Sequence, residues 1–214
     1  MPCRHAPLLL NFYRLFMKYF FLLLLFFLDL IAHERYSLRG AFGVATNSDY
    51  GQILYGHIEG HTGRPKVYAL DGGYLLQKNL FDVPLDLYLH GGVAYFDEGT
   101  LGSDIHETTL YVKLYYRFLN ETLRFGFGEG ASYTSGILFS EYESARSRND
   151  NTSHYLNYLD TSLDFDLGRV SDMEILEKTY IGLVIKHRSG IFGLINNVKK
   201  GGSNYNCFYV EKKF

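Results

Sequence analysis

The chain has 214 residues, of which 47% are hydrophobic and 17% aromatic, and its formal net charge is −2. This length predicts a single domain. The slightly acidic balance argues against a surface that binds nucleic acid, and the eight histidines show no ligand spacing, so we expect no metal and no cofactor.

A hydrophobic stretch near the N-terminus has the pattern of a secretory signal. Residues 20–28 are apolar, Met17 and a lysine precede them, and the small residue Ala32 follows at a plausible cleavage point. This core of roughly nine residues is too short for a membrane-spanning helix, which needs about 20. We therefore expect residues 1–32 to be an N-terminal segment with a cleaved signal, translation to start at Met17, and residues 33–214 to form the mature domain.

The cysteines predict an exported domain without disulfides. Only Cys3 and Cys207 are present, and Cys3 would leave with the signal. An exported chain that lacks disulfides needs another source of stability. A closed β-barrel provides one, because each backbone N–H and C=O group is paired between strands.

The mature region alternates between apolar and polar residues in segments of about ten residues, separated by Gly, Asn, Asp and Ser clusters. In the segment 155–167, one parity is apolar and the other is acidic: Tyr155, Leu159, Leu163, Phe165 and Leu167 against Asp160, Asp164 and Asp166. Such alternation predicts strands with one face in hydrocarbon or a core and the other in a polar environment.

We expect an all-β fold, an eight-stranded antiparallel up-and-down transmembrane β-barrel. The connections near 79–83, 120–121 and 169–177 are short and the others longer, as in outer-membrane barrels. Because such barrels have an even strand count, we interpret residues 52–59 as an extension of the first hairpin. The predicted strands are 35–46, 66–78, 84–96, 107–119, 122–134, 155–168, 178–189 and 204–214.

Parity alone fits either a membrane barrel or a secreted carrier with an apolar lumen. The terminal strand ends on Phe214, which resembles the C-terminal signal read by the barrel-assembly machinery, although Lys212 departs from that signal. The chain end thus favours the outer membrane of a Gram-negative bacterium.

A membrane barrel predicts which side chains face lipid and which face the lumen. Leu114, Phe165 and Ile185 should face lipid. The small residues Gly126, Gly128 and Gly130 should face the lumen. The charged residues expected to meet in the lumen are Lys113, Arg117 and Arg124 with Asp160, Asp164 and Asp166.

His187 and Ser189 form the pattern with chemical potential. Residues two apart on a strand point to the same side, so both lie at the end of the apolar face that carries Ile181, Leu183 and Ile185. A serine beside an imidazole suits nucleophilic acyl transfer, because a base must remove the hydroxyl proton. The competing interpretation is a polar strand end in the headgroup layer.

The last two predicted strands resemble those of the lipid A 3-O-deacylase family, the PagL-like proteins that are also described as acyloxyacyl hydrolases. The matching residues are His187-Arg188-Ser189-Gly190, Asn196-Asn197 and Gly201-Gly202-Ser203-Asn204. The resemblance implies an outer-membrane esterase that removes a 3-hydroxyacyl chain from the lipid A of lipopolysaccharide. It assigns the base to His187 and the nucleophile to Ser189.

The acidic member of the family's triad has no match here. Asn204 stands in its place, and it can orient an imidazole but cannot offset the charge of an imidazolium. Glu211 has the opposite parity and lies about 20 Å away at 3.3 Å per residue. Glu129 has the right parity but is two strands away.

The resemblance also implies donors for the oxyanion and the substrate. Gly190 follows the serine, where the family has Asn, and offers a backbone N–H, while Asn196 or Asn197 offers a side-chain donor. The basic residues near this segment form either a solvated rim or contacts to lipid A phosphates: Lys186, Arg188, Lys199 and Lys200. The alternative function is a non-catalytic barrel that is structural or adhesive through loops such as 137–154.

Overall fold

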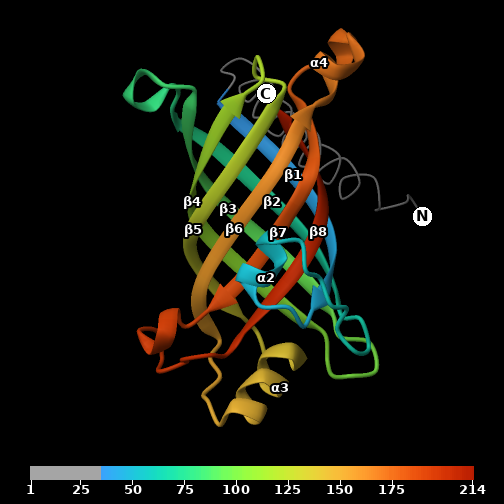
Figure 1. Cartoon of the computed structure of the whole chain (residues 1–214), viewed down its shortest axis with the longest axis vertical. Helices are drawn as coiled ribbons and strands as arrows, with labels where there is room; N and C mark the ends of the chain where they lie inside the picture. Colours follow the sequence, from blue (N-terminus) through green and yellow to red (C-terminus); the bar gives the residue numbers. More distant parts are fainter. Residues whose placement is uncertain (1–34) are drawn as a thin grey trace, which may run out of the picture.

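The computed structural model describes residues 35–214, so the predicted signal lies outside the described residues. Eight antiparallel strands pair in chain order, and β1 also pairs with β8, which closes the barrel (Figure 1). The predicted fold is confirmed. The strands are β1 Tyr36–Thr46, β2 Lys66–Gln77, β3 Leu85–Asp97, β4 Ile105–Phe118, β5 Leu123–Thr134, β6 Tyr155–Asp166, β7 Thr179–Ser189 and β8 Gly202–Lys213.

The observed strand ends differ from the predicted ones by a few residues, and one difference has a clear local cause. β6 ends at Asp166 instead of 168, because the Asp166 side chain accepts hydrogen bonds from the backbone N–H groups of Gly168 and Arg169. This carboxylate caps the short helix α4 (Leu167–Ser171). A side chain that caps a helix ends the strand before it.

The two ends of the barrel carry different connections. At the outer end lie α2 (Tyr50–Leu54), α3 (Phe139–Arg148) and the 3-10 turn η3 (Ile191–Gly193), and the opposite end carries η1 (Leu80–Asp82), α4 and η2 (Glu174–Leu176) (Figure 1). The predicted alternation of loop length holds only in part. The connection 167–178 is as long as 190–201, because α4 and η2 fold within it, and 98–104 is no longer than 78–84.

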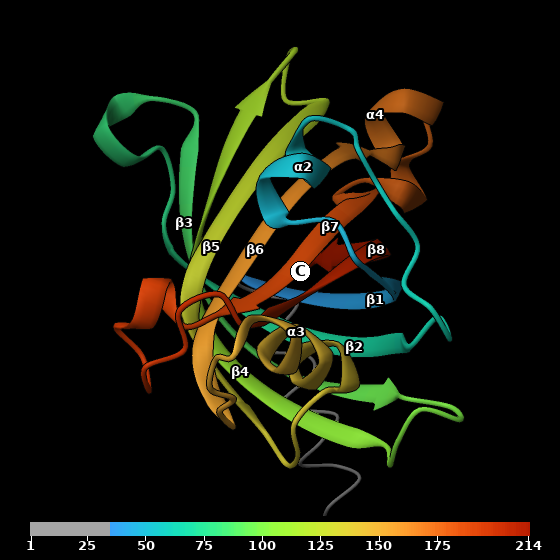
Figure 2. The ribbon, with the colours of Figure 1, turned by 60° about the horizontal axis from the view of Figure 1, so that its bottom comes forward.

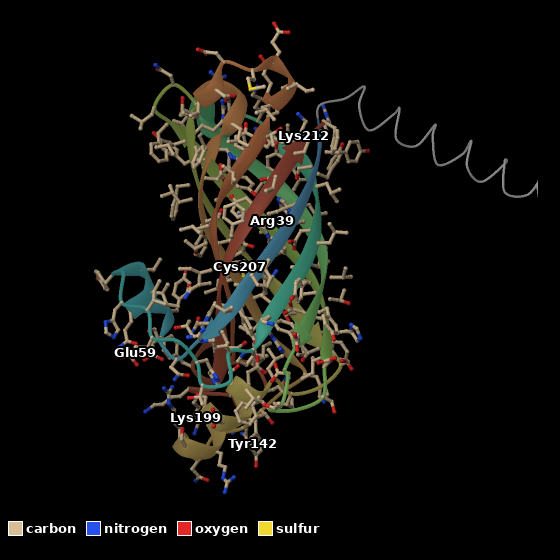
Figure 3. The ribbon with its side chains drawn as sticks, turned by 90° about the vertical axis from the view of Figure 1, so that its right-hand side faces the viewer. Arg39, Glu59, Tyr142, Lys199, Cys207 and Lys212 are labelled. Atoms are coloured by element: carbon tan, nitrogen blue, oxygen red, sulfur yellow. The ribbon has the colours of Figure 1, made fainter. Side chains whose placement is uncertain are left out.

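The segment 52–59 forms no ninth strand, and only its last residue extends the first hairpin, where the Asn47 N–H donates to the Glu59 carbonyl at 2.9 Å. Residues Tyr50–Leu54 are helical instead. The Gln52 side chain accepts a hydrogen bond from the backbone N–H of Asp49 at 2.8 Å, which stabilises the first turn. Figure 3 shows this helix beside the barrel wall, near Glu59.

The outer surface of the barrel is apolar and the lumen is charged. Leu163, Phe165 and Leu183 are exposed on the outside, whereas Lys113 and Asp160 are fully buried inside. This polarity is opposite to that of a soluble carrier with an apolar cavity, so that alternative is wrong. Within residues 35–214, no helix is long and apolar enough to cross a bilayer.

Ion pairs fill the lumen in layers. Asp160 contacts Arg39 at 2.6 Å and Lys113 at 2.5 Å. Nearer the periplasmic end, Arg124 contacts Asp164 and Glu211, both at 2.7 Å. Buried charges are tolerated when each has a partner of opposite sign, so these pairs are the core of the protein.

Two details of the predicted lumen need correction or explanation. Arg117 pairs with Asp86 and Glu121, not with Asp166, which caps α4 as described above. The prediction for the glycines is confirmed, since a side chain at Gly126 or Gly128 would collide with Lys113 and its neighbours. Small residues on β5 therefore make room for large lumenal side chains.

The helix α3 covers the outer mouth of the lumen (Figures 1 and 2). Leu138 and Glu141 are buried there. The Glu141 carboxylate accepts a hydrogen bond from Ser203 at 2.9 Å and pairs with Arg188 at 3.1 Å. These contacts fix the loop between β5 and β6 above the wall that carries the candidate site.

Candidate active site on the outer wall

A polar patch interrupts the apolar outer face near the outer ends of β6, β7 and β8. In the strand register, His187 lies between Leu159 of β6 and Asn204 of β8. Ser189 lies between Asn157 of β6 and Gly202 of β8. The pairing thus brings together residues from three strands, of which the sequence analysis had linked only His187, Ser189 and Asn204.

His187 is oriented by a chain of hydrogen bonds. Its Nδ1 lies 2.7 Å from Asn204 Oδ1, and Asn204 Nδ2 donates to the Ser48 carbonyl oxygen at 3.0 Å. The amide nitrogen of Asn204 donates to a carbonyl, so the amide oxygen of Asn204 faces the imidazole. This oxygen is an acceptor and therefore requires a proton on Nδ1 of His187. The Nε2 atom of His187 is then unprotonated and has the form that a general base needs.

Tyr50 of α2 covers the imidazole from outside the barrel. Its ring centroid lies 5.0 Å from that of His187, with 36° between the planes. Its hydroxyl forms a hydrogen bond with Thr161 on the outer face of β6. Tyr50 therefore fixes both the first loop and the histidine ring. No local pattern pointed to this residue, because Tyr50 and His187 are 137 positions apart in the chain and meet only where the first loop lies against the wall.

The polar patch forms the floor of a groove of about 1850 Å³. Strands β5 to β8 provide the floor, and α2, α3 and the β7–β8 loop provide the sides (Figure 2). His187, Ser189 and Asn204 all line it, and basic residues stand at its rim: Arg146, Arg148, Lys199 and Lys200. An amphiphile with an anionic head and an ester suits such a lining.

The side chains of Ser189 and His187 lie on the same face of β7 but are not hydrogen-bonded to each other. Alternate strand residues have Cα atoms roughly 7 Å apart, and within the described residues no hydrogen bond joins the two side chains. Proton transfer therefore needs a rotation of the Ser189 side chain toward Nε2. Such contacts often tighten only when substrate binds.

Asn157 is a site residue that the sequence analysis missed. The residue is 7% exposed and lines the groove next to Ser189, and its side chain makes no hydrogen bond to any other residue in the range 35–214. Its amide is not among the sealed polar groups of the described residues, so it is open to the groove and to a ligand there. The available signal was the parity of β6, where Asn157 and Thr161 are polar at positions that are otherwise apolar.

No family model matches this chain, and no curated protein matches its sequence. Among solved structures, it is similar to the outer membrane enzyme PagL, with a TM-score of 0.52 and 15% identity over 83% of this chain and 99% of that one. Neisserial surface protein A gives 0.47 and 14% over 85% and 97%. The attachment invasion locus protein Ail of Yersinia pestis gives 0.36 and 14% over 82% and 98%.

The likeness to PagL shows the fold. The chain is an eight-stranded barrel of the outer-membrane type, with an apolar exterior and a charged, filled lumen. Single-chain antiparallel barrels of this construction reside in the outer membrane of Gram-negative bacteria. The protein is therefore an outer-membrane barrel, and its activity has to be argued from the site itself.

Several residues implied by the family resemblance lie outside the groove. Arg188 points into the lumen, where it pairs with Glu141, and Lys186 also points inward and donates to Tyr158 Oη at 2.6 Å. Both have the opposite parity to His187, so the pleat directs them away from it. Of the four basic residues expected around the site, only Lys199 and Lys200 line the groove.

The asparagines of the β7–β8 loop have other partners. Asn196 Nδ2 donates to Ser153 Oγ at 2.8 Å and to the Tyr155 carbonyl at 3.0 Å. The carbonyl of Asn197 accepts a hydrogen bond from Asn151 at 3.1 Å. These bonds fasten the loop to its neighbour and leave neither residue in the lining of the groove.

The carboxylates considered as triad members are placed as the parity analysis expected. Glu211 lies in the lumen and pairs with Arg124. Glu129 of β5 lines the groove and pairs in register with Leu159 of β6, so β6 separates it from His187 of β7. The described residues hold no group of three or more His, Cys, Asp or Glu side chains suited to a metal ion.

Proposed function

We propose that this protein is an outer-membrane esterase that removes an ester-linked 3-hydroxyacyl chain from lipid A. The observation that carries the proposal is the Asn204-oriented His187 beside Ser189, in a groove on the lipid-facing side of the wall. Polar groups on such a face are costly. Their concentration around one serine is accounted for by chemistry on a membrane lipid.

The mechanism begins at Ser189. Its Oγ attacks the ester carbonyl carbon while Nε2 of His187 removes the hydroxyl proton. Asn204 keeps the imidazole in the tautomer that this step requires, but it supplies no negative charge to the imidazolium. We therefore expect turnover to be slower than with a carboxylate at that position.

The tetrahedral intermediate needs hydrogen-bond donors near its oxyanion. The Asn157 side-chain amide lines the groove next to Ser189 and is suited to this task. Gly190, the donor that the family resemblance implied, is buried against Val198 and is not among the residues that line the groove. Collapse of the intermediate breaks the bond between the acyl carbon and the sugar oxygen, which takes the proton from His187. Water, deprotonated by the same histidine, then attacks the acyl-enzyme and releases a 3-hydroxy fatty acid.

The rim of the groove supports a phosphorylated lipid as substrate. Lys199 and Lys200 lie on the β7–β8 loop, and Arg146 lies on α3 across the groove. Arginine and lysine pair strongly with phosphate oxygens. The cations lie above the apolar outer wall. A membrane lipid has the same arrangement, with its anionic head group above its acyl chains.

The test is mass spectrometry of lipid A from cells that express the wild-type protein, the Ser189→Ala variant or neither. We expect a species that lacks one 3-hydroxyacyl chain only with the wild-type protein. Equal deacylation by Ser189→Ala would remove Ser189 as the nucleophile. An unchanged lipid A profile with well-expressed wild-type protein would favour the non-catalytic barrel.

A further inference from the structure

Two turns that flank the groove carry large apolar side chains which the rest of the described chain leaves uncovered. One consists of the last residue of α2 and the turn after it and presents Leu54, Tyr55 and Ile58. The other is the turn 191–194, with Phe192 and Leu194. Tyr55 and Phe192 are each 93% exposed, the largest values among the exposed large hydrophobic residues of the described chain. Grouped exposure of this kind marks an interaction surface.

Both turns lie to the side of the barrel, α2 along the wall and the β7–β8 turn at the level of the outer strand ends. Figure 1 shows the β7–β8 turn to one side of the barrel, and Figure 3 shows α2 standing out from the wall. In contrast, α3 with Tyr142 lies past the end of the strands (Figure 3). The groove lies between the two turns, since Tyr50 and Phe192 both line it.

The β7–β8 loop is attached to the preceding loop through residues 196–201, whereas the turn 191–194 has no such attachment. The Asp150 carboxylate accepts hydrogen bonds from the backbone N–H groups of Lys199, Lys200 and Gly201. Although desolvation opposes it, these bonds lower the pKa of Asp150 to about 2, so the attachment persists at all physiological pH values. Residues 191–194 make backbone bonds only within the loop, such as Gly193 N–H to the Gly190 carbonyl.

The first loop has the same construction. Its base is held at the wall by the hydrogen bond of Tyr50 with Thr161 and by the Ser48 carbonyl, which accepts from Asn204 Nδ2 at 3.0 Å. The Ser48 Oγ accepts from the Glu59 N–H at 2.8 Å and closes the base of the loop. Beyond this base, Tyr55 and its apolar neighbours extend outward. The polar side chains of the segment contact each other, since His57 lies 3.0 Å from the Glu59 carboxylate.

The position of the two turns indicates which surroundings their exposed apolar side chains contact. On β7 the outer residues Ile181, Leu183 and Ile185 form part of the apolar band that faces lipid, and the turn 191–194 follows directly after this strand. A fixed polar base with a free apolar tip beside such a band suits shallow insertion into a bilayer. Tyrosine at the tip is typical of the interface.

We propose that the turns 54–58 and 191–194 insert into the hydrocarbon of the outer leaflet and make the groove open sideways to the membrane. The inserted tips form two lips, and a membrane lipid enters between them without leaving the bilayer. The insertion itself requires no catalytic activity.

The test uses single cysteines in a Cys3→Ser, Cys207→Ser background, labelled with bimane and reconstituted in phosphatidylcholine vesicles. Phe192→Cys and Tyr55→Cys are the test sites. Leu183→Cys is the control in the lipid-facing band, and Tyr142→Cys on α3 is the control beyond the mouth. Folding is checked by faster migration of the unheated barrel on gels, and Leu194→Cys replaces Phe192→Cys if the latter fails to fold.

We expect lipids with a spin label high on the acyl chain to quench the test sites and Leu183 at least about twofold more than Tyr142, with the opposite order for aqueous iodide. Test sites that match Tyr142 in both measurements would overturn the proposal. The Ser189→Ala change, added to each variant, should leave all values unchanged. Failure of insertion is therefore distinguishable from failure of the proposed esterase.

Discussion

The polar side chains of this barrel occupy two regions that are satisfied in different ways. In the lumen, the charges of Asp160 and Arg124 are matched by partners of opposite sign at hydrogen-bond distance. On the outer wall, His187, Ser189 and Asn157 belong to a patch in which Asn157 has no partner among the described residues. Paired polar groups stabilise the fold, whereas unpaired ones facing a groove are available to a ligand.

The comparison has an energetic consequence. Removal of one member of a buried ion pair leaves the other charge without compensation, which is strongly destabilising. Removal of a groove residue that contacts only ligand leaves the fold intact. Changes in the lumen should therefore affect stability before activity, and changes in the outer patch should do the reverse.

The largest expected effect is the loss of activity in Ser189→Ala and His187→Ala. Each should reduce deacylation by a factor on the order of 10³ or more, because each removes a member of the catalytic pair. Both proteins should keep the gel shift of the folded barrel. Normal turnover in either variant would place the chemistry outside this patch.

Asp160→Asn is the corresponding change in the lumen. It leaves Arg39 and Lys113 without their shared carboxylate, and we expect it to lower the free energy of unfolding by about 3–5 kcal/mol. Urea titration of the reconstituted barrel, followed by the gel shift, measures this loss. Asp172→Asn at an exposed turn is the control and should change stability by less than about 0.5 kcal/mol.

Asn157→Ala tests whether the unpaired amide serves the reaction. Loss of an oxyanion donor should reduce kcat by about 10²- to 10³-fold with little change in KM. Asn206→Ala is a matched control, because Asn206 is another outer-face asparagine whose Nδ2 lacks a partner among the described residues, but it does not line the groove. Equal losses in the two variants would indicate a structural role for Asn157.

Charges on the apolar face should cost most at the middle of the wall. Leu183 lies in the middle of β7 and is 67% exposed, whereas Phe165 lies one residue from the periplasmic end of β6. We expect Leu183→Arg to destabilise the barrel by about 2–4 kcal/mol and Phe165→Arg by about 1 kcal/mol or less. Unfolding titrations in vesicles compare the two, and equal costs would contradict this placement of the membrane.

The smallest expected effects concern Asn204. Asn204→Glu should preserve or raise deacylation, up to about tenfold, because a carboxylate stabilises the imidazolium that forms as Ser189 attacks. Asn204→Ala should lower the rate of deacylation by a similar factor, since the Nδ1–H group of His187 loses its acceptor, Asn204 Oδ1. Initial rates on purified lipopolysaccharide distinguish the two. A lower rate in Asn204→Glu than in Asn204→Ala would exclude an orienting role for this position.

The sequence alone determined the barrel, because a period of two repeated over eight segments admits few other folds. It also determined the faces: Lys113 and Asp160 lie inside, Leu163 and Phe165 outside, and His187 and Ser189 together on the outer wall. Parity is a local property of a strand and needs no knowledge of neighbours. The same parity places Arg188 and Lys186 inside the lumen, away from the site.

Only the tertiary structure decided which residues complete the site. Asn157 is the neighbour of Ser189 through the β6–β7 register, and Tyr50 and Ser48 arrive from a loop that folds back along the wall. The register depends on the pairing of whole strands, and the path of the loop depends on contacts such as Tyr50 with Thr161. Neither leaves a pattern within a single segment, since the interactions join residues that are distant in the chain and adjacent only when the barrel is closed.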